Sequence, residues 1–422
     1  MKTIKFHTLG CKVNQYDTQS IRERFLSNNF RENTNGKKAD FYLINTCTVT
    51  SSADRKSKEA ILRYAKANPN AKIIVTGCLI EKNTPELLSR VNGISYIIPK
   101  KFFLEGISNF CAHTRAFLKI QDGCNNYCSY CKVPLVRGNS RSKNIDKIIE
   151  EAKALVKNGF KEIVLTGICL GEYGKDLKIK DGLAKVIGYL EKLEGLSRIR
   201  LSSIEAKDVT SSLIKKFASS DKLCKHLHIP IQSGDDKILK IMNRKITHAG
   251  YLKLIRNIKK TIPNIAITCD VIAGFPGESE ANFANTIKLI QQITPLRTHI
   301  FPYSDRPGTR AFAFKEKTSP SVVKNRVLLL KKVSERCSLK YAKRFYAKTM
   351  PVLIEGRNRN STEFWQGYTD NYIKVLVKSK KVLNNRIIPL KLEKIINTQD
   401  TYYEHAAGFL CSIPKRGRAK KG

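Results

Sequence analysis

The stretch QDGCNNYCSYCKVP, residues 121–134, places Cys124, Cys128 and Cys131 within eight positions, in the spacing C-x3-C-x2-C. The glycine and two asparagines in the same stretch predict a loop. A loop can turn three sulfur atoms toward one point, which neither a helix nor a strand does at this spacing. We therefore interpret the three cysteines as ligands of one metal site.

A structural zinc ion would need a fourth protein ligand. The nearest other candidates, Cys111 and His113, precede the strand predicted at 115–120 and should lie at its opposite end. Iron–sulfur clusters are otherwise held by four cysteines, so three leave one iron open to an outside ligand. The spacing favours such a cluster, with a chemical role, over a closed zinc site.

Length and composition predict the number of domains, the compartment and the kind of partner. A chain of 422 residues predicts two or three domains. It shows no signal peptide and no apolar run of the roughly 18 to 20 residues that span a membrane, so we expect a cytoplasmic protein without a membrane partner. There the 12 cysteines should stay reduced. The formal charge of +41 favours a polyanionic partner, chiefly nucleic acid.

The first hundred residues repeat one pattern. TIKFHTLGC, DFYLINTC and KIIVTGC are short apolar runs, each followed by a helix-like segment, which predicts three βα units of an open parallel sheet. The runs end in Cys11, Cys47 and Cys78. The carboxyl ends of parallel strands meet at one edge, so these cysteines form a second candidate three-thiol site, the alternative being separate core thiols. We expect this domain to cover residues 1–110.

A second series of six apolar runs between about residues 115 and 304 alternates with helical patterns. It predicts a partial (βα)6 barrel, open on one side because a full barrel has eight units. The barrel domain, with a long connecting helix over Ser319–Lys348, should cover residues 111–345. Alternating apolar and polar residues then predict a small β-barrel at 346–414, followed by a basic tail at 415–422. The overall fold class is α/β.

The motif C-x3-C-x-aromatic-C, with Tyr130 as the aromatic residue, resembles the signature of radical S-adenosylmethionine enzymes. The resemblance implies that the amino and carboxylate groups of S-adenosylmethionine chelate the open iron. One electron from the cluster then cleaves the sulfonium, giving methionine and a 5′-deoxyadenosyl radical.

Further motifs resemble the methylthiotransferase family within those enzymes. These are TLGCKVNQYDTQ, INTCTVT and VTGC near the N-terminus, LHIPIQSGDDKILKIMNR and DVIAGFPGE in the barrel, and a terminal barrel similar to the OB-like, RNA-binding TRAM domain. The resemblance implies two [4Fe–4S] clusters, one on each three-cysteine set, and two uses of S-adenosylmethionine, as methyl donor and as radical source. It also implies a tRNA partner and an electron donor such as flavodoxin or ferredoxin, and it leaves the sulfur donor open.

Three branches of that family compete. One modifies N6-threonylcarbamoyladenosine at tRNA position 37, beside the anticodon; one modifies N6-isopentenyladenosine there; one modifies an aspartate of a ribosomal protein. The opening TLGCKVNQYDT is most similar to the first, since the isopentenyl branch more often has Gln-Met-Asn where this chain has Lys12, Val13 and Asn14. A rival of another class is a non-catalytic RNA-binding protein with two zinc sites.

The resemblance also suggests cofactor contacts. Gly274, Pro276 and Gly277 in AGFPGE could let backbone approach an adenine, or simply form a tight turn. Glu205 could reach cofactor or substrate, although Ala206 follows it where the family usually has proline. Remaining candidates are Arg244 for the methionyl carboxylate, or as a solvated side chain, and Gly171 and Glu172 for the cofactor's amino group.

Alternation in HLHIPIQ predicts that His228, Pro230 and Gln232 share one strand face, with Gln232 at the substrate cavity and His228 as a packed interior residue. Arg137 and Arg141 are expected either to touch tRNA phosphate or to close the cluster loop. The cysteines assigned to the core are Cys169, Cys224, Cys269, Cys337 and Cys411.

Overall fold

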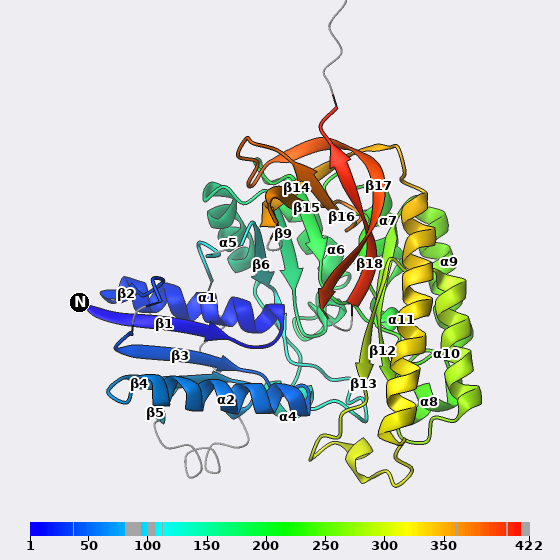
Figure 1. Cartoon of the computed structure of the whole chain (residues 1–422), viewed down its shortest axis with the longest axis horizontal. Coiled ribbons are helices and arrows are strands. Elements are labelled where there is room, and N and C mark those ends of the chain that lie inside the picture. The colour runs from blue at the N-terminus through cyan, green and yellow to red at the C-terminus, as the bar shows by residue number, and fades with distance from the viewer. Residues whose placement is uncertain are drawn as a thin grey trace, which may run out of the picture.

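The computed structural model describes residues 1–36, 38–80, 94–99, 106–111, 113–358, 361–401 and 404–414. The tail expected at 415–422 lies outside the described residues. Figure 1 shows an N-terminal sheet at the left, a ring of parallel strands and helices in the centre, and a small all-β unit above it.

The N-terminal sheet has five parallel strands in the order β2-β1-β3-β4-β5. Their bounds are β1 Lys2–Thr8, β2 Phe30–Glu32, β3 Phe41–Thr46, β4 Lys72–Gly77 and β5 Ile94–Ile97. The three predicted strands are β1, β3 and β4; the short edge strands β2 and β5 were not predicted. Helices α1 (Lys12–Ser27) and α2 (Ser51–Ala67) connect them.

Helix α1 joins this sheet to the central unit. Ile21 packs in the core of the sheet, whereas Tyr16, on the same helix, is fully buried in the core of the barrel. The helix therefore fixes the sheet against the barrel.

The central unit is the predicted six-stranded partial barrel. Its strands are β6 Arg115–Lys119, β9 Glu162–Thr166, β10 Arg198–Leu201, β11 His226–His228, β12 Ala266–Ala273 and β13 Arg297–Pro302. Parallel ladders join β6-β9-β10 and β11-β12-β13, and bridges Ile199–Leu223 and Ser203–His228 connect the two halves. The helices are α4 Val133–Arg137, α5 Ile145–Lys157, α6 Gly182–Leu190, α7 Ser211–Ser219, α8 Asp236–Ile241, α9 His248–Thr261 and α10 Glu280–Ile293, and a short ribbon pairs β7 Gln121–Asp122 with β8 Arg141–Ser142.

Strand β11 is shorter than predicted. It ends at His228, and Pro230 and Gln232 follow it in an irregular segment where Gln232 has φ +71°. Proline lacks an N–H group for a ladder, and a positive φ turns the chain away from strand geometry. The continuous strand predicted for these three residues is therefore wrong beyond His228, although all three line the same cavity.

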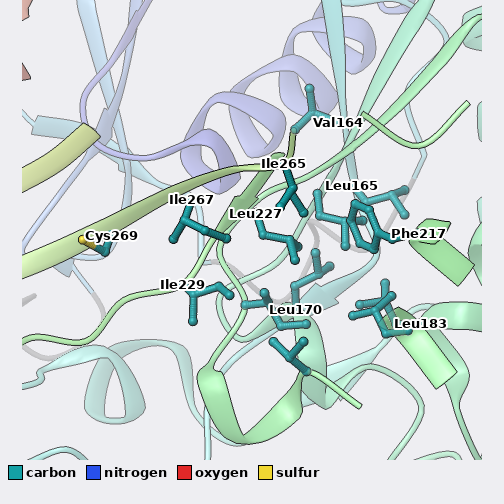
Figure 2. Packing of buried hydrophobic residues seen from close by; sticks show 14 of the residues in the cluster. Val164, Leu165, Leu170, Leu183, Phe217, Leu227, Ile229, Ile265, Ile267 and Cys269 are labelled. Atoms are coloured by element: carbon teal, nitrogen blue, oxygen red, sulfur yellow. The ribbon is translucent and has the colours of Figure 1, made fainter. Parts of the chain in front are cut away.

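Apolar side chains of the barrel strands face the surrounding helices. Figure 2 shows Leu165, Leu227 and Ile267 grouped with Phe217 of α7 and Leu183 of α6. Because strand side chains alternate in direction, the neighbouring positions, such as Thr166, His228 and Thr268, face the barrel interior.

The predicted connecting helix is α11, Pro320–Lys343, which packs against β13 and β18. It leads into a closed barrel with the strand order β14-β15-β16-β18-β17. These strands are β14 Thr349–Asn358, β15 Ser361–Thr369, β16 Lys374–Lys378, β17 Ile387–Thr401 and β18 Glu404–Ser412. The small β-barrel is therefore confirmed. Among the described residues, no helix has the length and apolarity needed to cross a membrane.

Candidate functional site

The loop with Cys124, Cys128 and Cys131 follows β7 at the carboxyl end of the first barrel strand. Gly123 starts it with φ +75°, and a Cβ there would lie 2.0 Å from the Asn139 carbonyl oxygen, so only glycine fits. The Ser129 N–H donates to the Met242 carbonyl at 3.0 Å, and the Ala311 N–H donates to the Ser129 carbonyl at 2.8 Å. Backbone bonds from two distant segments thus fix the loop across the end of the barrel.

The pKa values of the three thiols in this loop are shifted in different directions. Burial raises the pKa of Cys131 to about 12 and also raises that of Cys128, whereas a hydrogen bond from Cys169 lowers that of Cys124. Metal ligands are thiolates, so cluster assembly must displace protons from the two buried thiols.

Cys169 was predicted to be an ordinary core thiol. It is buried, but its sulfur lies within 4.8 Å of the ligand atoms of Cys124 and Glu172, and Asn126 donates to it at 3.4 Å. The prediction of an apolar setting is wrong, because the turn after β9 brings Cys169 beside the cluster loop. The other four cysteines assigned to the core, Cys224, Cys269, Cys337 and Cys411, are buried as expected.

The second cysteine set lies at the carboxyl edge of the N-terminal sheet. Cys11 is the exposed N-cap of α1, while Cys47 and Cys78 are buried directly after β3 and β4. Burial raises the pKa of Cys47 to about 11. Gly77 has φ +102°, and a Cβ on it would lie 2.3 Å from the Thr46 carbonyl oxygen, so glycine lets the two strand ends approach closely.

Both cysteine sets open onto adjoining cavities. A cavity of about 90 Å³ is lined by Cys11, Cys47 and Cys78 together with Cys131, and one of about 600 Å³ by Cys124, Cys128, Cys131 and again Cys11. The two sets therefore face each other across the boundary between the sheet and the barrel. Each supplies three thiols, a donor set that fits a cluster with one open iron.

A buried ionic network crosses the same boundary. Arg137 donates to both oxygens of Asp122, at 2.9 and 3.0 Å, and forms an ion pair of 3.3 Å with Asp17 of α1. It also donates to Asn14, and Lys119 pairs with Asp17. Arg137 is only 5 % exposed, so it braces the cluster loop from inside the protein and is not placed to touch a tRNA phosphate. Arg141, by contrast, is exposed.

Two residues predicted to contact cofactor bind each other. Arg244 donates to Glu205 at 2.5 and 2.8 Å, to the Pro230 carbonyl at 2.9 Å and to the Cys128 sulfur at 3.7 Å. Arg244 is therefore a buried, paired residue beside the cluster loop, not a solvated one. Contact of either residue with the methionyl group remains a prediction.

The AGFPGE loop packs against Tyr130 of the cluster loop but does not line the large cavity. The Gly274 N–H donates to Glu278 at 2.9 Å, and a Cβ on Gly274 would lie 2.4 Å from Val323. Phe275 packs edge-on against Tyr130, with ring centroids 6.4 Å apart. Tyr130 lines the large cavity, but Gly274, Pro276 and Gly277 are not among the residues that line it, and their contact with an adenine stays a prediction.

Gln232 lines the large cavity, and its backbone bonds extend the ladder with β12; its contact with the substrate stays a prediction. Gly171 packs so closely on Asp208 that a Cβ would lie 2.3 Å from that side chain, and Glu172 is buried beside Cys169. His228 is not simply packed: it faces the cavity and lies 3.1 Å from Asp270. Sequence reasoning missed Asp270, His299, Arg200 and Arg297, which line the same cavity.

Comparisons with known proteins agree with this arrangement. The Radical SAM superfamily matches residues 118–290, and the Uncharacterized protein family UPF0004 matches residues 3–99. A threonylcarbamoyladenosine tRNA methylthiotransferase of Bacillus subtilis is 38 % identical over 93 % of this chain and 94 % of its own length. The chain belongs to the radical S-adenosylmethionine methylthiotransferase family.

A tRNA-2-methylthio-N(6)-dimethylallyladenosine synthase of Clostridium tetani is 33 % identical over 94 % of each chain. Among solved structures, the radical S-adenosylmethionine methyltransferase TsrM of Kitasatospora setae shares the fold, with a TM-score of 0.50 and 11 % identity over 74 % of this chain and 77 % of that one. As a member of its family, the chain uses S-adenosylmethionine and [4Fe–4S] clusters.

Proposed function

We propose that this enzyme converts N6-threonylcarbamoyladenosine at tRNA position 37 to its 2-methylthio derivative. The observation that carries the proposal is the relation to threonylcarbamoyladenosine tRNA methylthiotransferases, at 38 % identity for that of Bacillus subtilis and 36 % for that of Thermotoga maritima. The dimethylallyladenosine synthase of Clostridium tetani shares 33 %. Methylthiolation of N6-isopentenyladenosine is therefore the second candidate.

Each three-cysteine set is proposed to hold one [4Fe–4S] cluster. Cys124, Cys128 and Cys131 would hold the cluster that, with S-adenosylmethionine, supplies a 5′-deoxyadenosyl radical. Cys11, Cys47 and Cys78 would hold the cluster that presents sulfur. The facing positions of the two sets support this division, because hydrogen abstraction and sulfur delivery must reach one carbon.

The protein's own residues would orient the reactants and keep out water. Arg244 and Glu205 form a charged pair beside Cys128, and either can exchange its partner for the carboxylate or amino group of the methionyl moiety. Tyr130 would border the bound cofactor, and Gln232 the base. The AGFPGE loop, Gly274, Pro276 and Gly277, is proposed to approach the adenine of the cofactor through its backbone.

tRNA would be the macromolecular partner, and the net charge of +41 supports it through phosphate contacts. A reductant such as flavodoxin or ferredoxin would supply electrons. A tRNA substrate and reduced clusters also favour the cytoplasm.

Nucleoside mass spectrometry of tRNA from a strain lacking this chain tests the proposal. We expect loss of the 2-methylthio form of threonylcarbamoyladenosine with its precursor retained. Loss of 2-methylthio-isopentenyladenosine instead would favour the second candidate, and an unchanged profile would refute both.

A further inference from the structure

The barrel interior carries many polar and charged side chains beside apolar ones such as Val164, Leu201 and Phe301, whereas parallel barrels are usually filled with branched apolar side chains. The positions that line the 600 Å³ cavity from successive strands alternate with the apolar residues that face the helices. They are Thr166, Arg200, Ser202, His226, His228, Thr268, Asp270, Arg297 and His299. Several of these groups already bond within the protein, as His226 and His228 do with Thr268 and Arg200 does with Glu162. The 600 Å³ cavity that they border is large enough for a small organic group and presents polar atoms to it, as ligand sites do.

The end of this cavity farthest from the cluster loop is cationic. Arg115, Arg200 and Arg297 surround the ring of Tyr372 from the C-terminal barrel, with guanidinium carbons 5.5, 4.7 and 5.8 Å from its centroid. Glu355 pairs with Arg115 and Glu162 pairs with Arg200, at 2.6 Å for the latter.

Positive charge dominates there in spite of the two carboxylates. Burial alone would raise the pKa of Tyr372, but Arg115, Lys12, Arg297 and Arg200 together lower it to about 8. A negatively charged group entering this end of the cavity would therefore be stabilised.

A hydrogen-bonding cluster lies on the neighbouring strands. The Nε2 of His228 is 3.1 Å and the Nδ1 of His299 is 3.3 Å from the same oxygen of Asp270. Thr268 of β12 lies between His228 of β11 and Arg297 of β13 in the strand register. Two residues further along β12, toward the cluster loop, Asp270 lies beside His299. Arg297 and the two histidines thus share one wall of the cavity.

We propose that Arg297, with the His228–Asp270–His299 cluster, binds the carboxylate-bearing substituent on N6 of the target adenosine, and that this wall selects the threonylcarbamoyl over the isopentenyl group. The inference rests on the proposed function. A threonylcarbamoyl group offers a carboxylate, a hydroxyl group and a urea, which the guanidinium, imidazole and carboxylate groups of this wall can pair. An isopentenyl group has none of these and would displace water from the wall without offering it a charge or a hydrogen bond, which is the kind of difference that discriminates strongly between substrates.

The test uses reconstituted full-length enzyme and three anticodon stem–loop RNAs, carrying threonylcarbamoyladenosine, its threonine carboxamide analogue, or unmodified adenosine. The variants are Arg297→Gln, which removes the charge, and Arg297→Lys, which keeps it. Affinity is measured without S-adenosylmethionine by fluorescence anisotropy, and kcat/KM by product mass spectrometry. Iron content and 5′-deoxyadenosine formation without RNA check that each variant is folded and loaded.

We expect the wild type to prefer the carboxylate over the carboxamide by at least about tenfold, the range for hydrogen bonds to a charged group. Arg297→Gln should abolish that preference, and Arg297→Lys should retain part of it. His299→Gln should weaken binding of both N6-substituted RNAs but not of the unmodified RNA.

An Arg297→Gln enzyme that keeps the full preference would overturn the inference, as would an extra metal ion bound by the wild type and lost in His299→Gln. If the wild type methylthiolates none of the three RNAs, the proposed function itself fails, which is a different result from loss of selectivity.

Discussion

At the scale of single residues, the cysteine spacing carried most of the sequence argument. Cys169 shows what spacing cannot predict. It lies 45 positions after Cys124 in the chain, and the turn after β9 brings the two sulfur atoms close together. Spacing predicts ligands that share one loop. It cannot predict a thiol brought in by tertiary structure.

A pair of substitutions separates the ligands from this neighbour. Cys124→Ala should lower the iron content of reconstituted enzyme from about eight to about four per chain, because a [4Fe–4S] cluster is lost. Cys169→Ala, the matched control, should leave about eight irons. Colorimetric iron analysis measures both, and the opposite pattern would show that Cys169 is the ligand.

Glu278 gives a residue-scale prediction on pH. Burial raises its pKa to about 7 although Arg326 lies 2.8 Å away. Between about pH 4.5 and 7 the folded chain binds more protons than the unfolded chain, so this group's contribution to stability falls as pH rises through that window. The melting temperature of Glu278→Gln relative to the wild type should therefore rise between pH 5 and pH 8, by a few degrees. An unchanged difference across that range would contradict the assignment.

At the scale of elements, the repeated runs predicted the parallel strands because short apolar, β-branched segments that alternate with helical patterns rarely form anything else. The edge strands β2 and β5 were missed because three or four residues are too short to show a period. The end of β11 was missed because Pro230 and the positive φ of Gln232 break the strand inside an apolar run. The polar interior was missed because sequence alternation does not say which face closes into a barrel.

The boundary between α1 and the cluster loop gives a second test on stability. Arg137→Leu should destabilise the chain by about 3 to 5 kcal/mol, because it leaves Asp17 and Asp122 buried with an uncompensated charge. Arg141→Leu, in the same segment but exposed, should change stability by no more than about 0.5 kcal/mol. Denaturant unfolding measures the free energy of unfolding of both variants. Equal changes in the two would show that the buried ionic network does not stabilise the fold.

At the scale of the whole molecule, three units converge on one cavity. The N-terminal sheet brings Cys11, the barrel brings the cluster loop, and the C-terminal barrel brings Tyr372 to the other end. Arg198 and Arg200 hold that barrel in place by donating to the carbonyls of Tyr368 and Asp370, at 3.1 and 2.9 Å. The C-terminal unit therefore closes one end of the site.

The net charge of +41 predicts strong salt dependence of tRNA binding. If six to ten phosphates are neutralised, affinity should fall by about 10³ to 10⁵ between 50 and 200 mM salt, because released counterions drive binding. Filter binding across that range measures the slope. A slope near zero would exclude an extended phosphate interface.

We expect the two cysteine sets to cooperate in methylthiolating one adenosine. Reconstituted enzyme, reductant and a sulfur source are incubated with tRNA carrying threonylcarbamoyladenosine and with methyl-deuterated S-adenosylmethionine, and the nucleosides are analysed by mass spectrometry. We expect one trideuterated 2-methylthio product, one S-adenosylhomocysteine and at least one 5′-deoxyadenosine per turnover. A wild-type enzyme that forms 5′-deoxyadenosine but no methylthio nucleoside on this tRNA would contradict this expectation.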